Sequence, residues 1–131
     1  MIKTWYVGVV VAAVFLIVAA CGGGETSAPA HDDGSLTDAG RELFTSQGCA
    51  ACHTAGGVGA DVGPSLDGLF GTQRELASGE TVTADAGYIM ESIKTPAVKV
   101  TKGFPEGLMP PFDQLSSNEV HQLVHFIESL K

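Results

Sequence analysis

Positively charged side chains are scarce in this 131-residue sequence, which has seven Lys and Arg against 15 Asp and Glu and a formal net charge of −8. Proteins that bind nucleic acids neutralise phosphates with Lys and Arg, and adhesion to anionic lipid by charge also needs a basic surface. The charge balance therefore argues against a nucleic acid as partner and against electrostatic adhesion to a membrane.

Cysteine is also rare, with three in the whole sequence. Cys49 and Cys52 form a single C-x-x-C, and neither a second C-x-x-C nor a suitably spaced Cys/His pair accompanies it. A structural zinc site needs four such ligands, so this pattern argues against zinc. A thioredoxin-like redox site needs a βαβ context, whereas the residues before Cys49 have the periodicity of a helix.

A histidine follows the C-x-x-C directly, which gives the run Cys49-Ala50-Ala51-Cys52-His53. C-x-x-C-H is the motif by which a c-type haem is attached. Two cysteines with this spacing can form thioethers with both vinyl groups of the porphyrin, and His53 can then ligate the iron. The sequence therefore predicts one covalently bound haem c, held by Cys49, Cys52 and His53.

Met90 and Met109 are the candidates for the second axial ligand of the iron. Met109 lies between two expected helices, and the two prolines that follow it stiffen the segment that would hold its sulfur. Met90 lies within an expected helix beside Ile89 and Ile93, where a methionine usually packs in a core. We expect Met109 to be the ligand, and a thioether opposite a histidine raises the reduction potential.

Residues 1 to 20 are nearly all apolar, with Lys3 as the only charge. They predict a secretory signal, with an uncleaved anchor as the alternative because about 20 apolar residues can span a bilayer. The run Val18-Ala19-Ala20-Cys21 resembles the lipobox of bacterial lipoproteins, which implies a diacylated Cys21; the alternative is a free thiol. Acyl chains anchor a protein durably when there are two or more. We therefore expect a lipid-anchored protein, with its haem domain in the periplasm or on the outer face of the cytoplasmic membrane.

Residues 21 to 34 are rich in Gly, Pro and acidic residues and lack apolar periodicity, which predicts a flexible linker. The expected organisation is a lipoprotein signal peptide at residues 1–20, a lipid-anchored linker at 21–34 and a mono-haem domain at 35–131. Removal of the signal peptide takes away one lysine, so six basic side chains remain against 15 acidic ones, a formal charge of −9.

Four local elements are expected in the haem domain. Apolar residues at helical spacing predict a helix at about residues 37 to 47, ended by Gly48, and a last helix at about residues 117 to 130, capped by Ser117. Alternating residues on either side of Ser78-Gly79 predict a short hairpin over residues 73 to 82. A further helix is expected to start at Thr83-Ala84-Asp85 and to end near Thr95, since Pro96 follows.

Residues 35 to 131 therefore resemble a class I cytochrome c, an all-α fold with crossed first and last helices around one haem. More narrowly, the stretch from Arg74 to Asp85 and the run Met109-Pro110-Pro111-Phe112 resemble the cytochrome c domain of subunit II of caa-type haem-copper oxidases. No copper-binding domain and no paired transmembrane helices precede these residues in the sequence. We therefore expect a free-standing lipoprotein cytochrome, such as the mono-haem subunit of alternative complex III or a tethered carrier to an oxidase.

The resemblance also implies roles for single residues. In class I cytochromes a proline at the distance of Pro64 accepts a hydrogen bond from the haem histidine, which implies that Pro64 orients His53. Gly40 and Phe44 correspond to the residues by which the first helix crosses the last. Their partners on the last helix are then Leu123 and Phe126.

These features lead to the hypothesis of an electron carrier rather than an enzyme. It would pass electrons between a quinol-oxidising complex and a terminal oxidase, with redox proteins of a respiratory or photosynthetic chain as partners and no small-molecule substrate. Iron ligated by both His53 and Met109 changes charge without changing its coordination. A five-coordinate haem acting as a peroxidase or gas sensor is the alternative, and an architectural subunit of a larger complex is a third hypothesis.

Two further groups of charged or polar residues have open interpretations. Lys94, Lys99 and Lys102 fall within nine residues shortly before Met109, so they could dock an acidic partner at the haem edge or simply form a solvated loop. His121 and His125 stand four apart on the last expected helix, a spacing that can hold zinc but is more often a polar stripe.

Overall fold

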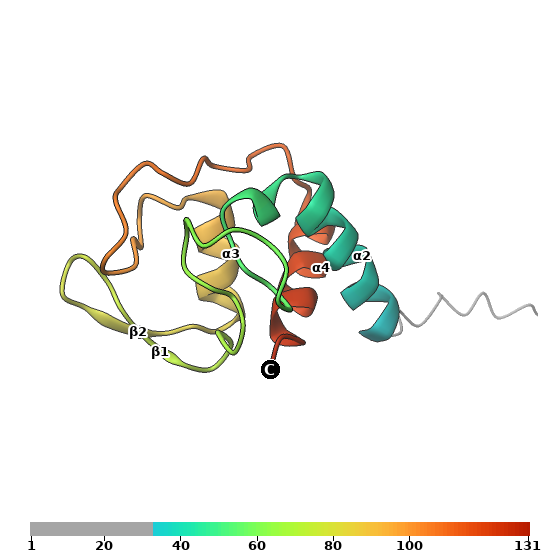
Figure 1. Cartoon of the computed structure of the whole chain (residues 1–131), viewed down its shortest axis with the longest axis horizontal. Helices are drawn as coiled ribbons and strands as arrows, with labels where there is room; N and C mark the ends of the chain where they lie inside the picture. The colour runs from blue at the N-terminus through green and yellow to red at the C-terminus, as the bar shows by residue number, and fades with distance from the viewer. Residues whose placement is uncertain (1–32) are drawn as a thin grey trace, which may run out of the picture. The chain divides into compact units, whose positions relative to one another are not determined.

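The computed structural model describes residues 33–131, which form three α-helices, one 3-10 helix and a two-stranded antiparallel sheet (Figure 1). The elements are α2 (Asp33–Ser46), η1 (Cys49–Ala51), β1 (Gln73–Glu75), β2 (Thr81–Thr83), α3 (Ala86–Lys94) and α4 (Ser117–Glu128). The predicted helical fold with one short hairpin is confirmed. Within residues 33–131, no helix is long and apolar enough to cross a membrane. The predicted signal peptide and Cys21 lie outside the described residues.

Helices α2 and α4 cross in close contact (Figure 1). Gly40 is buried at the crossing, where a Cβ would lie 1.9 Å from the main-chain oxygen of Gln122 and 2.8 Å from the Cβ of Phe126. Close by, the ring centroids of Phe44 and Phe126 are 5.4 Å apart. The predicted crossing is present, with Phe126 beside Gly40 and Phe44 as expected, and the main chain of Gln122 makes the closest approach to Gly40.

The start of α2 differs from the predicted bound. The helix begins at Asp33, earlier than expected, and the acidic side chain of this residue in the first turn is favourable for the helix dipole. Residues 34–36, which precede the predicted start, therefore lie inside the helix. Its end matches the expectation, because Gly48 adopts a left-handed conformation with φ 78° just after the last turn.

The start of α4 is fixed by a capping box one residue earlier than predicted. Ser116, not Ser117, caps the helix: its Oγ accepts a hydrogen bond from Glu119 N, and its own N–H donates to the Glu119 carboxylate at 2.7 Å. The helix buries one face, formed by Val120, Leu123, Val124, Phe126 and Ile127. This face matches the apolar stripe predicted from the sequence.

The predicted hairpin and third helix are also present. Strands β1 and β2 pair from Gln73↔Thr83 to Glu75↔Thr81. The chain at residues 100–102 runs beside β1, since Lys102 N donates to Glu75 O at 2.9 Å and Ala77 N to Val100 O at 2.8 Å. The sequence did not predict this pairing. Asp85 caps α3 by accepting a hydrogen bond from Tyr88 N at 2.8 Å.

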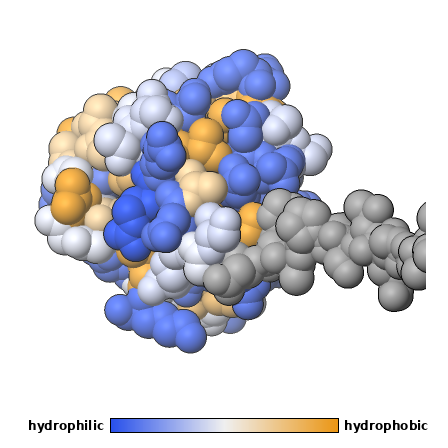
Figure 2. Space-filling view, turned by 90° about the vertical axis from the view of Figure 1, so that its right-hand side faces the viewer, coloured by the Kyte–Doolittle hydropathy of each residue, from blue (hydrophilic) through white to orange (hydrophobic). Residues whose placement is uncertain are grey.

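Seen from the side of α2, polar residues cover much of the surface, with apolar residues scattered among them (Figure 2). The large apolar residues gather inside instead. The core includes Phe44, Leu76, Ile89, Leu123, Phe126 and Ile127, each at most 5% exposed. Part of this core also forms the wall of a cavity.

Candidate haem site

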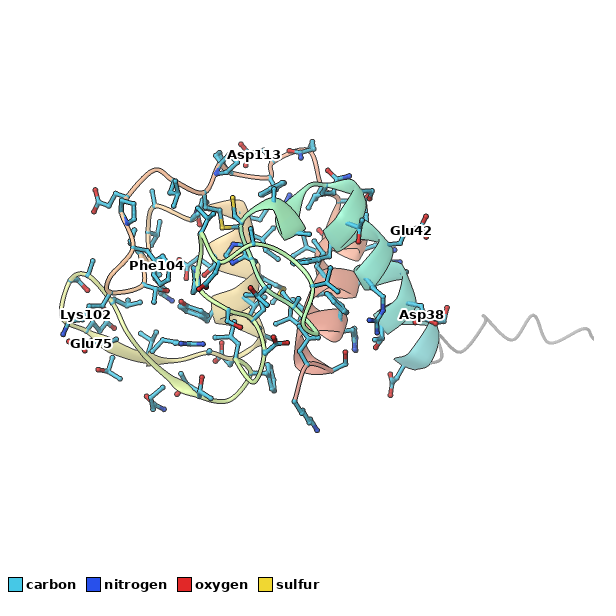
Figure 3. All side chains as sticks on the ribbon, in the orientation of Figure 1. Asp38, Glu42, Glu75, Lys102, Phe104 and Asp113 are labelled. Atoms are coloured by element: carbon cyan, nitrogen blue, oxygen red, sulfur yellow. The ribbon has the colours of Figure 1, made fainter. Side chains whose placement is uncertain are left out.

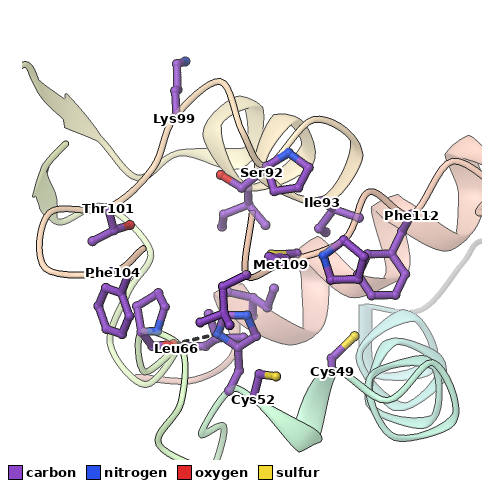
Figure 4. A pocket seen from close by; sticks show the side chains of 18 of the residues that line it. Cys49, Cys52, Leu66, Ser92, Ile93, Lys99, Thr101, Phe104, Met109 and Phe112 are labelled. Atoms are coloured by element: carbon purple, nitrogen blue, oxygen red, sulfur yellow. Dashed lines mark hydrogen bonds between the residues drawn. The ribbon is translucent and has the colours of Figure 1, made fainter. Parts of the chain in front are cut away.

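An apolar cavity of about 350 Å³ lies beside α3 and α4 and is bordered by the segment that follows η1 and the segment that follows α3 (Figure 4). This volume falls within the range of about 300–1,000 Å³ that is typical of sites for small molecules and cofactors. Buried apolar side chains form much of its wall, among them Phe44, Tyr88, Ile89, Ile93, Leu123 and Ile127. All four residues predicted to hold a haem line the same cavity: Cys49, Cys52, His53 and Met109.

The three residues of the C-x-x-C-H motif reach the cavity because the chain turns tightly at η1. The main-chain oxygen of Cys49 accepts hydrogen bonds from Cys52 N at 3.1 Å and from His53 N at 3.0 Å. One turn therefore carries both sulfurs and the imidazole. Both cysteines are partly buried and line the cavity, and burial raises the pKa of the Cys49 thiol in the unattached chain.

His53 is oriented by the main chain of residues 63 and 64. Its Nδ1 donates a hydrogen bond to the carbonyl oxygen of Pro64 at 2.8 Å, which is the contact that the resemblance to class I cytochromes implied. Because a carbonyl can only accept, the proton is on Nδ1, and Nε2 keeps its lone pair for a ligand. A Cβ at Gly63 would lie 2.8 Å from His53 Cε1, so only glycine leaves room for the imidazole in this position.

The two candidate methionines lie in different surroundings. Met109 lines the cavity, on the segment between α3 and α4 (Figure 4). Met90 is partly buried and packs against the hydrophobic core, and it is not among the residues that line the cavity. This difference favours Met109 over Met90 as a ligand.

Two polar atoms in the cavity wall lack a partner among the described residues. Arg74 Nε and Ser92 Oγ are buried and make no hydrogen bond, although both residues line the cavity. A buried polar group without a partner is costly, so these atoms indicate a bound group that carries hydrogen-bond acceptors. Neither residue was predicted from the sequence to belong to the site. Nothing in the local sequence singles out Arg74, because its neighbours Gln73 and Glu75 are also polar; its lower exposure within β1 appears only in the structure.

The three lysines shortly before Met109 each bind a partner within the domain. Lys99 pairs with Glu91 at 2.7 Å, and Lys102 pairs with Glu75, beside which it lies in Figure 3. Lys94 binds main-chain oxygens of the segment after Met109. Each ammonium therefore has a partner within the domain, and Lys99 also lines the cavity.

The histidine pair on α4 is near the surface. His125 Nδ1 lies 3.9 Å from the Glu128 carboxylate, and His121 is exposed. Among residues 33–131, no group of three or more His, Cys, Asp or Glu side chains is placed to hold a metal ion.

Comparison with known proteins identifies the family. The family model described as Cytochrome c matches residues 37–131. The chain belongs to the cytochrome c family. The prediction of a class I c-type cytochrome is confirmed, and with it the binding of haem c, because a cytochrome c domain carries this group covalently.

Two curated relatives of this cytochrome are informative. Cytochrome c oxidase subunit 2 of Alkalihalophilus pseudofirmus is 28% identical over 98 residues, which cover 74% of this chain and 26% of that protein. Cytochrome c of Cannabis sativa is 45% identical over 47 residues, which cover 35% of this chain and 41% of the relative. The cytochrome thus spans about a quarter of the first relative's length and less than half of the second's.

The cavity of this cytochrome suits a haem in its chemistry. A porphyrin has a broad apolar body, which the buried aromatic and aliphatic wall can surround, and it carries two propionates. These acceptors match the unpartnered donors of Arg74 and Ser92. Proteins of this family transfer electrons by a haem. In this chain, two thiols, an imidazole, a thioether and polar donors all line the same cavity.

Proposed function

We propose that this cytochrome carries electrons by a single haem that is attached to Cys49 and Cys52 and ligated by His53 and Met109. The observation that supports this proposal is that all four side chains line one apolar cavity. When bound, the haem supplies the change between ferric and ferrous iron. The chain supplies the two covalent attachments, both axial ligands and a wall that excludes water.

His53 and Met109 have different roles in this proposal. The Pro64 carbonyl accepts the Nδ1 proton of His53, which keeps Nε2 free to ligate and makes the imidazole a stronger donor. Met109 contributes a soft, neutral sulfur, which favours the ferrous state and so raises the reduction potential. Two protein ligands leave no position for a substrate, so the site transfers charge and makes no bonds.

The substitution Met109→His tests the sixth ligand. We expect a lower midpoint potential and loss of the weak Fe–S charge-transfer band in the ferric spectrum, because imidazole replaces the thioether. Met90→Leu is the matched control, since Met90 packs against the core. It should leave both the band and the potential unchanged. Loss of the band in Met90→Leu instead would show that Met90 is the ligand.

The alternative of a peroxidase or gas sensor needs an open sixth position. The wild-type ferrous protein distinguishes the two functions, because low-spin iron with two protein ligands resists carbon monoxide. We expect no rapid binding. A high-spin ferrous spectrum that changes at once on addition of carbon monoxide would reject the electron-carrier proposal in favour of this alternative.

We further propose that lipid on Cys21 tethers the haem domain to the outer side of a bacterial membrane, with the signal peptide removed and residues 21–32 as linker, since α2 begins at Asp33. Support comes from the sequence before Cys21, since these residues lie outside the described part of the chain. Cys21→Ser should release haem-stained protein from the membrane fraction into the soluble fraction, and mass spectrometry of the wild type should find acyl chains on Cys21. A wild-type protein with an unmodified Cys21 thiol would contradict the proposal.

The proposed partners are a quinol-oxidising complex as donor and a terminal oxidase as acceptor. The similarity to a subunit 2 of cytochrome c oxidase supports an oxidase as one partner. Gentle detergent extraction followed by native electrophoresis tests this proposal, because the haem stain should migrate with one of these complexes if the cytochrome is a bound subunit. If it migrates alone, the purified cytochrome should be reduced by the quinol-oxidising complex and oxidised by the terminal oxidase. Failure to exchange electrons with either complex would contradict it.

A further inference from the structure

The segment after Met109 is attached to the end of α3. Pro110 and Pro111 have no N–H, so the first main-chain donor after Met109 belongs to Phe112. This N–H donates to the carbonyl oxygen of Ile93 at 3.1 Å. The labelled side chains of Ile93, Phe112 and Met109 lie near one another in Figure 4. The position of the methionine therefore depends on a contact that lies three residues further along the chain.

Lys94, the last residue of α3, strengthens the same attachment. Its ammonium donates to the carbonyl oxygens of Phe112 and Asp113, both at 3.3 Å, and to that of Leu115. An ammonium has three donors, and all three are used on one short segment. Hydrogen bonds from a charged donor are roughly twice as strong as those between neutral groups.

The attachment connects two walls of the cavity. Ile93 lines it from α3, while Met109, Phe112 and Leu115 line it from the segment that Lys94 holds. Lys94 is not among the lining residues, so any effect on the bound group must pass through the main chain of residues 112–115. If this segment moved away from α3, the stiff pair of prolines would carry Met109 with it.

We propose that Lys94 is a positioning residue that keeps the Met109 sulfur at the iron. The inference rests on the proposed function, because it assumes that Met109 is the sixth ligand. Loss of the ammonium leaves three carbonyl oxygens with one donor fewer each and lets the segment open. Met109 should then leave the ferric iron more often, while the thioethers and His53 hold the haem in place.

The experiment measures how fast imidazole replaces Met109 in the purified ferric holoprotein. At high imidazole concentration, the observed rate approaches the rate at which the Fe–S bond opens. Lys94→Met keeps the aliphatic stem and removes the ammonium, and we expect a limiting rate at least tenfold above wild type. Lys94→Arg keeps a charged donor and should stay closer to wild type than Lys94→Met.

Lys102→Met is the matched control. Lys102 precedes Met109 in the chain but pairs with Glu75 on β1 rather than with the segment after Met109. Its limiting rate should stay within twofold of wild type. Equal rates in Lys94→Met and Lys102→Met would overturn the proposal, because removal of any nearby lysine would then have the same effect.

A second measurement on the wild type covers the case in which Lys94→Met fails to fold. Hydrogen exchange of the Phe112 amide reports opening of its bond to Ile93. The free energy of opening that this exchange gives should be no larger than the free energy of Met109 dissociation, since the segment must open to release the sulfur. A clearly larger opening free energy at the Phe112 amide would reject Lys94 as the positioning residue. Absence of the Fe–S band from the wild-type spectrum would instead reject the proposed ligation itself.

Discussion

His53 is held on two sides by the chain that follows it. The Pro64 carbonyl accepts the proton of Nδ1, and the ring lies against the backbone at Gly63. The two contacts act together: the hydrogen bond sets the tautomer, and the close packing sets the angle of the ring. A single methyl group is therefore enough to disturb the orientation of the proposed ligand.

Gly63→Ala tests this packing. The added Cβ would lie 2.8 Å from His53 Cε1, closer than real Cβ contacts come, so the ring must turn away from its present position. We expect the free energy of unfolding of the holoprotein to fall by about 1 to 3 kcal/mol, as is typical of overpacking. The weakened bond to Pro64 should also raise the midpoint potential, because a less basic imidazole stabilises ferric iron less. Denaturant titration and potentiometry measure the two effects, and an unchanged value of both would contradict the argument.

At the scale of elements, the crossing of α2 and α4 depends on the missing side chain of Gly40. Gly40→Ala would place a Cβ 1.9 Å from the main-chain oxygen of Gln122, and backbone on both sides must then move. We expect destabilisation by at least about 3 kcal/mol, the upper end for overpacking. Denaturant titration of the holoprotein measures it.

Gly87→Ala on α3 is the control for this prediction. A Cβ there meets only the end of the Asp85 side chain, at 3.3 Å. Because alanine favours the helix over glycine, the stability should stay within about 1 kcal/mol of wild type. Equal losses in Gly40→Ala and Gly87→Ala would show that helix glycines matter here for another reason than the crossing.

The capping box of α4 makes part of the stability depend on pH. Hydrogen bonds from Ser116 hold the pKa of Glu119 below its ordinary value of 4.5. A carboxyl with a lowered pKa in the folded state stabilises the fold at pH values above its unfolded pKa, and this contribution is lost as the pH falls through the folded pKa. Ser116→Ala should cost about 1 kcal/mol at neutral pH through loss of the helix cap.

The difference in unfolding free energy between wild type and Ser116→Ala should shrink as the pH falls below 4.5, because protonated Glu119 no longer accepts these bonds. Ser117→Ala is the control, since Ser117 was predicted as the cap but Ser116 makes the capping bonds. A larger effect of Ser117→Ala would contradict the observed cap.

At the scale of the whole molecule, the three lysines shortly before Met109 do not neutralise the excess of acidic side chains. Lys99 and Lys102 pair with carboxylates, and Lys94 with carbonyl oxygens. Carboxylates elsewhere in the sequence outnumber basic groups, so the field around the protein is negative. A partner with a basic docking face fits this field.

Reactions with small oxidants of opposite charge test the sign of that field. A cationic cobalt(III) phenanthroline complex should oxidise the reduced protein more slowly as the salt concentration rises. Salt screens the attraction between opposite charges, and the Debye length is only about 10 Å at 0.1 M. Ferricyanide, an anion, should show the opposite dependence. Stopped-flow spectrophotometry measures both second-order rate constants. The reverse pair of salt dependences would show that positive charge dominates at the haem edge.

Local sequence determined much of the fold. The C-x-x-C-H turn, Gly48 as the end of α2, the hairpin at Ser78-Gly79 and the buried face of α4 all follow from residues close together in the chain. Helix starts were less accurate: the cap of α4 differs by one residue. The difference arises because adjacent serines compete for one carboxylate, and only the backbone geometry selects between them.

Tertiary structure alone decided which distant residues meet in the site. The partners of the lysines, the unpartnered donors of Arg74 and Ser92, and the pairing of residues 100–102 with β1 have no signature in local spacing. Lys94 and Leu115 are 21 positions apart, and they meet because α3 and the segment after Met109 pack on the same cavity. Spacing in the sequence is enough to place an imidazole and two cysteine side chains on one turn. Only packing can bring Met109 to the same cavity.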